Sequence, residues 1–151
     1  MTARSSHKNS GTHLWLVLSR ATRAVEARAL ESINDTGLGA SDFAVLETLL
    51  HKGPQPVNAI GKLVLLTSGS ITSAVDRLVA RGLVRRTEHD NDRRVRMVEL
   101  TAEGRKLIVP AFARHERDLE HVAAVLSPGE RTTLINLLRT LGTSAEEGRD
   151  Q

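Results

Sequence analysis

Five arginines lie close together in the middle of the chain, and their type and spacing suggest a chemistry more clearly than any other residues do. They are Arg85, Arg86, Arg93, Arg94 and Arg96. A guanidinium group stays charged and presents a planar fork of N–H donors that matches the oxygens of a phosphate. The cluster therefore indicates contact with a nucleic acid, although a charged run is more often only a solvated surface.

Short polar side chains form a second group, on a helix predicted just before the arginines. The buried stripe of this helix is defined by apolar residues at helical spacing, namely Ile71, Ala74, Val75 and Leu78. The opposite face carries Ser70, Ser73, Asp76 and Arg77, with Thr72 at its edge. A face this slim and polar fits the major groove of DNA, which is roughly 12 Å wide.

The charge of the chain is concentrated where these two groups lie. The net charge of the whole chain is only +3, but residues 58–100 contain eight basic and five acidic residues. The segments on either side are close to neutral. A local basic region of this kind is typical of nucleic-acid binding, and by itself it is weak support.

Other site chemistries lack their usual residues. The chain has no cysteine, which excludes a disulfide scaffold, a thiol nucleophile and a thiolate metal site. Its six histidines show no metal-binding spacing, and the glycine-rich and nucleophile-elbow motifs of common enzyme classes are absent. Asp90 and Asp92 are paired only on an exposed turn, where nothing favours acid–base catalysis. We therefore expect no catalytic residue, no metal and no cofactor.

Length and hydropathy indicate one globular domain. The chain has 151 residues, of which 40% are hydrophobic and 26% are charged. No apolar run approaches the 18 or so residues of a membrane helix, and the first residues do not form a signal peptide. We expect a cytoplasmic protein without a membrane partner, with flexible tails at residues 1–12 and 142–151.

The first half of the chain is predicted to be helical. Apolar spacing predicts a helix over residues 13–33, which Gly37 and Gly39 end. Ser41 is the expected N-cap of a second helix that stops at Gly53-Pro54. Two short helices follow, the first capped by Asn58 and the second by Thr67 or Ser68, and Gly82 ends the latter.

The spacing of apolar residues then changes from the helical period to a pattern typical of β-strands. Residues 83–88 and 94–100 are rich in Val, Leu and Thr and are predicted strands, joined by a polar turn. Thr101 is expected to cap a long helix that reaches about residue 126 and is kinked at Pro110. Ser127 and Glu130 form a capping box for a last helix with a leucine seam, which we expect to end near residue 141.

This order of elements predicts a mostly helical fold with a small β-hairpin wing, a winged helix-turn-helix. The DNA-reading lobe covers residues 41–100, and residues 13–36 and 102–141 form flanking dimerisation helices around it, within one domain of residues 13–141. The flanking helices carry more apolar surface than the lobe can cover, which indicates a homodimer. A two-fold dimer would place its recognition helices one DNA turn apart, as palindromic double-stranded DNA requires.

Three stretches resemble the MarR family of transcription regulators over about residues 13–141. Asp92-Arg93-Arg94, followed by Val98, Leu100-Thr101 and Gly104, looks like the family's wing signature. Residues 75–78 and 81–84 are similar to its recognition helix and next strand, and residues 126–130 to the start of its last helix. The resemblance implies a dimeric regulator, usually a repressor, that a small aromatic or phenolic ligand relieves. Residues 42–47 and 65–72 are similar to the branch that responds to quinones and catechols.

The resemblance also implies roles for single residues. Arg94 matches the wing arginine that enters the minor groove, and Asp92 matches the acidic residue that orients it. The recognition-helix positions that meet bases or phosphates correspond to Ser68, Ser70, Thr72, Ser73 and Arg77. Ser73 is smaller than the residue of many relatives, and Arg96 stands where the strand is commonly apolar. Arg86 and Arg93 complete the candidate DNA contacts, and since Arg85 and Arg86 alternate, at most one of these two faces DNA.

The three aromatic residues are candidates for a ligand pocket. Trp15, Phe43 and Phe112 either line a cleft between the dimer helices and the lobe or belong to an ordinary core, and His13 is a candidate beside them. Without cysteine, a quinone effector would have to act without a thiol. Two other interpretations stay open: a DNA-binding regulator or architectural protein that responds to no ligand, and a winged helix that binds only proteins.

Overall fold

The computed structural model describes residues 9–64, 67–89 and 92–148, and for positions 89 and 92–95 it describes the backbone only. The elements in chain order are α1 (Gly11–Ile33), a 3-10 turn η2 (Asn34–Thr36), α2 (Ala40–Lys52), β1 (Gln55–Pro56), α3 (Val57–Leu63), α4 (Ser68–Ala80), β2 (Val84–His89), β3 (Asp92–Leu100), α5 (Ala102–Ala123) and α6 (Pro128–Glu147). The predicted winged helix-turn-helix architecture is confirmed. No single helix in these ranges is long and apolar enough to cross a membrane.

The sheet is small and antiparallel, with the strand order β1-β3-β2. The hairpin pairs Val84 with Leu100 and Glu88 with Arg96. The short strand β1 pairs Gln55 with Val98, and it was not predicted because two residues give no alternating pattern. This third strand ties the turn before α3 to the wing.

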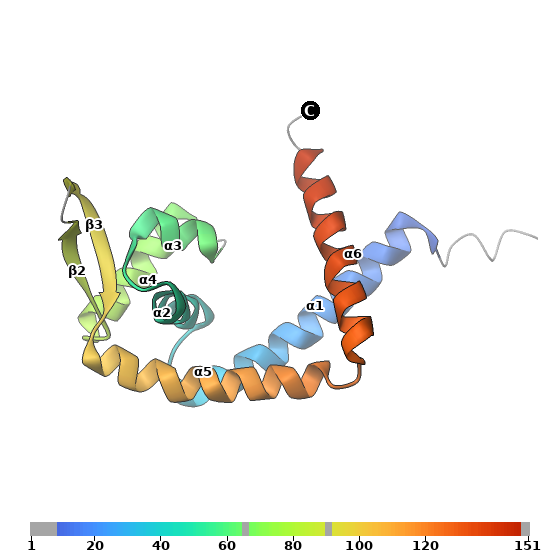
Figure 1. Ribbon diagram of the computed structural model, residues 1–151, viewed down its shortest axis with the longest axis horizontal. Coiled ribbons are helices and arrows are strands. Elements are labelled where there is room, and N and C mark those ends of the chain that lie inside the picture. The colour runs from blue at the N-terminus through green and yellow to red at the C-terminus, as the bar shows by residue number, and fades with distance from the viewer. Residues whose placement is uncertain (1–8, 65–66, 90–91, 149–151) are drawn as a thin grey trace, which may run out of the picture.

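The core lies where α2, α3 and α4 meet the sheet and the first part of α5 (Figure 1). The residues without exposed surface include Val45, Leu46, Ile60, Ala74, Val75, Leu78, Val98 and Ile108. The apolar stripe of α4 is buried here as predicted, which leaves its polar face outside. Fixing one face inward thus fixes which residues α4 can present to a partner.

Helix caps confirm some predictions and correct others. The hydroxyls of Thr67, Thr101 and Ser127 accept hydrogen bonds from the first turns of α4, α5 and α6. The prediction for Ser41 is wrong, because α2 begins at Ala40 with Gly39 as its N-cap. The prediction for Asn58 is also wrong: α3 starts directly after the paired Pro56, which holds the N-cap position and places Asn58 inside the helix.

Several helix boundaries also differ from the predictions. Helix α1 starts at Gly11 rather than residue 13, and α5 ends at Ala123 rather than near residue 126. The predicted tail of residues 142–151 is wrong for its first part, because α6 continues to Glu147. Gly142 lies inside this helix without ending it, since a lone glycine lowers helix stability by only about 1 kcal/mol.

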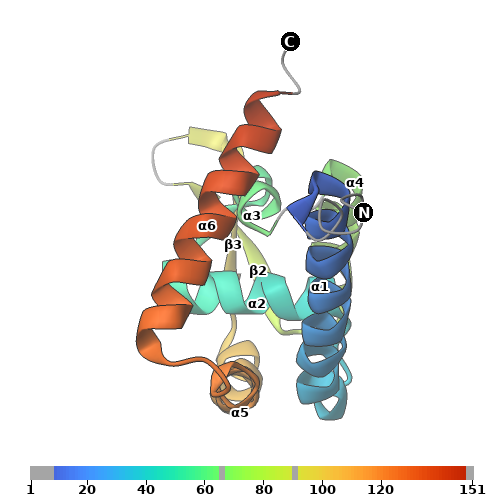
Figure 2. The same cartoon turned by 90° about the vertical axis from the view of Figure 1, so that its right-hand side faces the viewer.

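The flanking helices extend away from the lobe. Helix α5 runs as one continuous helix through Pro110, with the lobe at one end and α6 at the other (Figure 1). Figure 2 looks along α5 and shows α1 and α6 on opposite sides of it. Helix α6 has no buried residue, and in α1 only Ser32 and Ile33 are buried. The end of α1 and the first part of α5 therefore contribute Ile33 and Ile108 to the core of the lobe, while α6 and most of α1 cannot bury their apolar faces within one chain.

A close backbone contact joins α5 to the wing. Thr101 donates its backbone N–H to the carbonyl oxygen of Leu83 at 3.1 Å and its hydroxyl to that of Gly82 at 2.7 Å. A Cβ atom on Gly104 would lie 1.9 Å from the oxygen of Leu83, well inside van der Waals contact. Only glycine therefore lets the first turn of α5 lie against the base of the wing.

We predict that G104A destabilises the lobe by about 1–3 kcal/mol, the usual effect of overpacking, because the clash is with the backbone next to β2 and cannot be relieved by a rotamer. Urea unfolding followed by circular dichroism measures the change. G129A is the matched control, since a Cβ there meets nothing within 4 Å. Equal stability of the two variants would contradict the close contact.

Candidate nucleic-acid interface

The exposed face of α4 consists mainly of short hydroxyl side chains. Ser70, Thr72 and Ser73 are exposed, as predicted from their spacing, and Ser68 is exposed as well. The Thr72 hydroxyl donates to the carbonyl oxygen of Ser68 at 2.9 Å, and the Thr67 hydroxyl donates to the side-chain hydroxyl of Ser70 at 2.9 Å. These local bonds hold the hydroxyls close to the helix, so the helix is narrow enough for a groove.

The start of α4 borders a shallow depression of about 530 Å³. The residues that line it are Ser41, Thr67, Gly69, Ser70, Ser73 and Arg77. All but Ser41 belong to α4 or to its N-cap, and Ser41 comes from the first turn of α2. Of the predicted contact residues on α4, Ser70, Ser73 and Arg77 line the depression, and Ser68 and Thr72 lie outside it.

Arg77 is held by two residues that the sequence analysis did not identify as functional. Its Nη2 donates to Oδ1 of Asp42 at 2.5 Å and to the hydroxyl of Ser41 at 3.2 Å, and its Nε donates to Oδ2 of Asp42 at 3.2 Å. The hydrogen bond to Asp42 raises the pKa of Arg77 above its ordinary value. Asp42 is almost completely buried, and an acidic residue inside the otherwise apolar stripe of α2 was the available signal.

Asp76, which precedes Arg77 on α4, connects this helix to the wing. Asp76 accepts a hydrogen bond at 2.5 Å from Nη2 of Arg86, which lies on β2. Arg85 points away from this helix and donates to Glu99 of the adjacent strand. The predicted alternation of Arg85 and Arg86 is confirmed, and Arg86 joins the wing to the recognition helix.

The wing itself is described only in part. Arg96 is exposed, and its guanidinium lies 3.8 Å from the carboxylate of Glu88, the residue opposite it in the hairpin. The backbone of Asp92, Arg93 and Arg94 belongs to β3, but their side chains lie outside the described part of the structure. Their predicted roles in DNA contact stay predictions.

The four ligand candidates do not come together within one chain. His13 and Trp15 are exposed on the first turns of α1, whereas Phe43 is buried in the core and Phe112 is half-buried on α5. Two histidines that the sequence analysis left unassigned pack on the phenylalanines instead. The ring centroids of Phe43 and His115 are 5.0 Å apart, and those of His51 and Phe112 are 4.5 Å apart.

The proton on His115 can be assigned from its hydrogen bonds. The hydroxyl of buried Ser32 donates its one hydrogen to the carbonyl oxygen of Ala29 at 2.7 Å, so it can only accept from Nδ1 of His115, which is 2.5 Å away. Nδ1 therefore carries a proton, and Nε2 is the acceptor in the neutral ring. The bond connects α1 to α5 directly beside Phe43.

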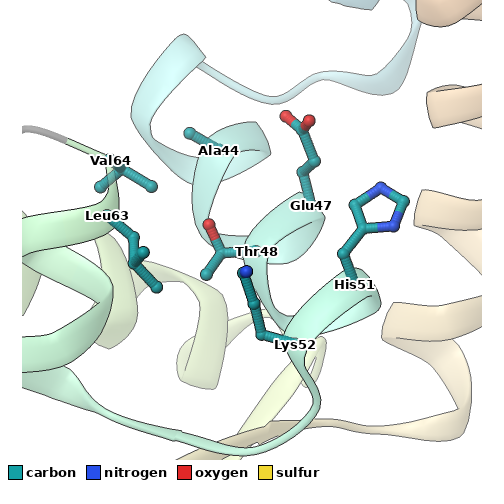
Figure 3. Close-up of a pocket in the computed structure, with 7 residues that line it drawn as sticks. All are labelled: Ala44, Glu47, Thr48, His51, Lys52, Leu63 and Val64. Carbon is teal, nitrogen blue, oxygen red and sulfur yellow. The ribbon is translucent and has the colours of Figure 1, made fainter.

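A second recess opens on the outer face of α2 (Figure 3). It has a volume of about 360 Å³ and an apolar side formed by Ala44, Leu63 and Val64. The other side carries the polar groups of Glu47, Thr48, His51 and Lys52. His51 lines this recess and also contacts the ring of Phe112 edge to face, so the recess lies next to the packed rings. Within the described ranges, no three His, Asp or Glu side chains lie together as metal ligands would.

Comparison with known proteins identifies the family. A model of the MarR family matches residues 38–95. The HTH-type transcriptional regulator MhqR of Bacillus subtilis is 38% identical over 134 residues, which are 89% of this chain and 92% of MhqR. The chain belongs to the MarR family. The HTH-type transcriptional regulator PecS of Dickeya dadantii is 32% identical over 80% of this chain and 75% of PecS.

Solved structures support the same conclusion. BpsR of Bordetella bronchiseptica, whose DNA binding is regulated by 6-hydroxynicotinic acid, is 28% identical with a TM-score of 0.75 over 85% of this chain and 98% of that one. A cysteine-to-serine mutant of MarR from E. coli, solved with operator DNA, has a TM-score of 0.76 at 24% identity over 85% of this chain and 92% of that one, which shows the shared fold. The MarR-family resemblance is thus confirmed, and the protein is a transcriptional regulator of this family.

Proposed function

We propose that this MarR-family regulator is a homodimeric repressor that binds palindromic double-stranded DNA and is released by a small aromatic ligand. The observation that carries the proposal is the exposed hydroxyl-rich face of α4, which lies beside the arginine-rich hairpin. In this proposal helix α4 enters a major groove of the DNA, and the hairpin follows the sugar–phosphate backbone into the adjacent minor groove. Acting on DNA would place the protein in the compartment that holds it, which agrees with the predicted cytoplasmic location.

Base reading on α4 would depend on short side chains. Ser68, Ser70, Thr72 and Ser73 can donate to or accept from base edges or ordered waters, and none of them fills the groove. Serine and threonine pair with several bases, so much of the specificity would come from DNA shape and from the wing. Arg77, on α4 itself, and Arg86, which pairs with Asp76 from β2, would add positive charge beside this face.

In the wing, Arg94 is proposed to enter the minor groove, with Asp92 orienting its guanidinium. Arg93 and the exposed Arg96 would contact phosphates on either side. Each arginine that neutralises a phosphate releases a counterion, which makes the affinity fall as salt rises. The wing therefore supplies most of the expected salt dependence.

We predict that R94A lowers the affinity for selected DNA by about tenfold or more and reduces the slope of log K against log salt by about one, because the interface loses one positive charge and binding releases fewer counterions. Fluorescence anisotropy at several salt concentrations, with DNA that the full-length protein selects from a random pool, measures both. R117A, an exposed arginine on α5, is the control. If R94A binds as tightly and with the same slope, the proposed role of the wing is wrong.

The uncovered helices α1 and α6 are proposed to form the dimer interface. Large apolar side chains are exposed on both in the single chain, among them Trp15 at 64% and Leu137 at 63%. Others are Leu14, Leu16, Val17, Leu134, Ile135, Leu138 and Leu141. Apolar surface of this extent usually marks an interface. A second copy with the same exposed surface is the partner that a closed two-fold interface requires.

We predict that L137E weakens the dimer at least about a hundredfold, since a charge would be buried among leucines, while the lobe keeps its fold. Sedimentation velocity measures the association, and the fluorescence of Trp15, the one tryptophan of the chain, should shift to the red as it becomes solvated. N136E places the same charge at an already polar position of α6 and should leave the dimer intact. A fully dimeric L137E protein would contradict the proposed interface.

The proposed ligand site is the recess on α2 together with the neighbouring rings of Phe43, Phe112 and His51, of which Phe43 and Phe112 both contact His115. The apolar side formed by Ala44, Leu63 and Val64 and the polar groups of Glu47, Thr48 and His51 on the other side suit a flat aromatic molecule with hydroxyl groups. His13 and Trp15 would take part where the α1 helix of the second copy reaches the site. The regulation of BpsR by 6-hydroxynicotinic acid supports this ligand class. A quinone effector would bind without a thiol, because the chain has no cysteine.

We predict that a ligand of this class, tested with catechol, hydroquinone and 6-hydroxynicotinic acid, raises the melting temperature and releases DNA over the same concentration range, as linkage requires. H51A should require about tenfold more ligand for both effects, because it removes a ring and a polar group from the recess. H121A, a histidine outside the recess, should require no more than the wild type. If no such compound has either effect, the protein is interpreted as a DNA-binding regulator that responds to no ligand, and the proposed ligand site is wrong. Absence of DNA binding at low salt would favour a protein-interaction module.

A further inference from the structure

We propose that the buried carboxylate of Asp42 is a positioning residue for DNA reading, because it fixes which edge of the Arg77 guanidinium faces the DNA. The inference rests on the proposed function, since it assigns a role within the DNA contact of α4. It concerns two residues that are 35 positions apart in the chain, Asp42 in the first turn of α2 and Arg77 near the end of α4.

The carboxylate holds the guanidinium at two points. Both oxygens of Asp42 accept from Arg77, one from Nε and one from Nη2, which is the bidentate geometry that fixes the plane of the guanidinium. The hydroxyl of Ser41 accepts a further hydrogen bond from Nη2 at 3.2 Å. Asp42 itself is only 5% exposed and belongs to a helix whose other inward residues are core, so it cannot follow the arginine if the arginine moves.

Only part of the Arg77 guanidinium is left to donate hydrogen bonds to DNA. A guanidinium has five N–H groups, one on Nε and two on each terminal nitrogen. Asp42 and Ser41 take the Nε hydrogen and the two on Nη2. The two on Nη1 have no hydrogen-bond partner among the described residues, and the side chain of Arg77 is 52% exposed at the edge of the depression that Ser70 and Ser73 line. Nη1 is therefore the edge that a phosphate or a base would meet.

The other contacts of α4 do not provide this orientation. Arg81 donates to the carbonyl oxygen of Gly37 at 3.0 Å, and Arg86 reaches Asp76 from β2, so both fix the position of the helix as a whole. Neither touches the guanidinium of Arg77. Without Asp42, the helix would stay in place, but the arginine side chain would be free to rotate.

The pair also has an electrostatic consequence. Arg77 and Asp42 together are neutral, so Arg77 contributes a directional hydrogen bond to DNA and little net charge. Replacing the carboxylate by an amide would release a full positive charge at the interface. We therefore expect two opposite effects: weaker discrimination between DNA sequences, and stronger salt-dependent binding to any DNA.

The experiment compares the full-length wild type with D42N on two DNA duplexes, one selected by the wild type from a random pool and one scrambled. For D42N we expect the ratio of the two affinities to fall about tenfold, and the salt slope on scrambled DNA to become steeper by up to about one. A residue that only stabilises the fold would lower both affinities together. D118N is the matched control, because it removes a carboxylate that lies 3.9 Å from Arg114 on α5, away from α4.

Two further variants test whether Asp42 acts through Arg77 and provide a test if D42N does not fold. If Asp42 acts through Arg77, D42N has no additional effect on the ratio in an R77Q background. S41A removes the hydroxyl that accepts from Nη2 of Arg77 and donates to Oδ1 of Asp42, but it leaves both bonds between the carboxylate and the guanidinium. It should therefore lower the ratio by a smaller factor, which keeps the test available if D42N does not fold in thermal unfolding. Independent effects of D42N and R77Q would overturn the inference.

The outcomes separate this inference from the proposed function. If the wild type discriminates between the two duplexes but D42N and D118N share its ratio and slope, Asp42 has no positioning role and the regulator assignment stands. If the wild type itself does not discriminate, the proposed function fails and this inference fails with it.

Discussion

The burial of one face of α4 is the constraint on which the rest of the structure depends. Its apolar residues Ile71, Ala74, Val75 and Leu78 have almost no exposed surface, because α2, α3 and the sheet cover them. At roughly 25 cal/mol per Å² of apolar surface, the burial of four such side chains is among the larger favourable terms of so small a core. Since side chains on a helix repeat about every 3.6 residues, this burial also decides that the serines and Arg77 face outward.

Polar contacts then refine what burial has fixed. The stripe sets the rotation of α4, and the pairs Arg77–Asp42 and Arg86–Asp76 attach its two sides to α2 and to the wing. An exposed ion pair adds little stability, but a pair with one buried, doubly hydrogen-bonded partner restricts geometry strongly. The lobe is therefore a rigid unit for reading DNA, and Gly104 allows α5 to lie against the base of the wing.

The long helices serve a different physical purpose. Because α6 buries none of its residues within one chain, its apolar seam contributes to stability only after association. The contact between Ser32 and His115 joins α1 to α5 beside Phe43, a core residue of the lobe. Any ligand that changes the packing around these rings would act on the junction between dimer helices and lobe, where a small shift changes the spacing of two recognition helices.

The amino-acid sequence by itself determined the order of the helices and of the two hairpin strands, the buried stripe of α4, the caps at Thr101 and Ser127, and the arginine-rich hairpin. These follow from local periodicity and local hydrogen bonding, which a linear pattern records. Only the tertiary structure decided that Ser41 holds Arg77 rather than capping α2, that Asp42 is the buried partner of that arginine, and that His51 and His115 pack on the phenylalanines. Each of these contacts joins residues that are distant in the chain, and their side chains carry no periodic signal of the partner they will meet.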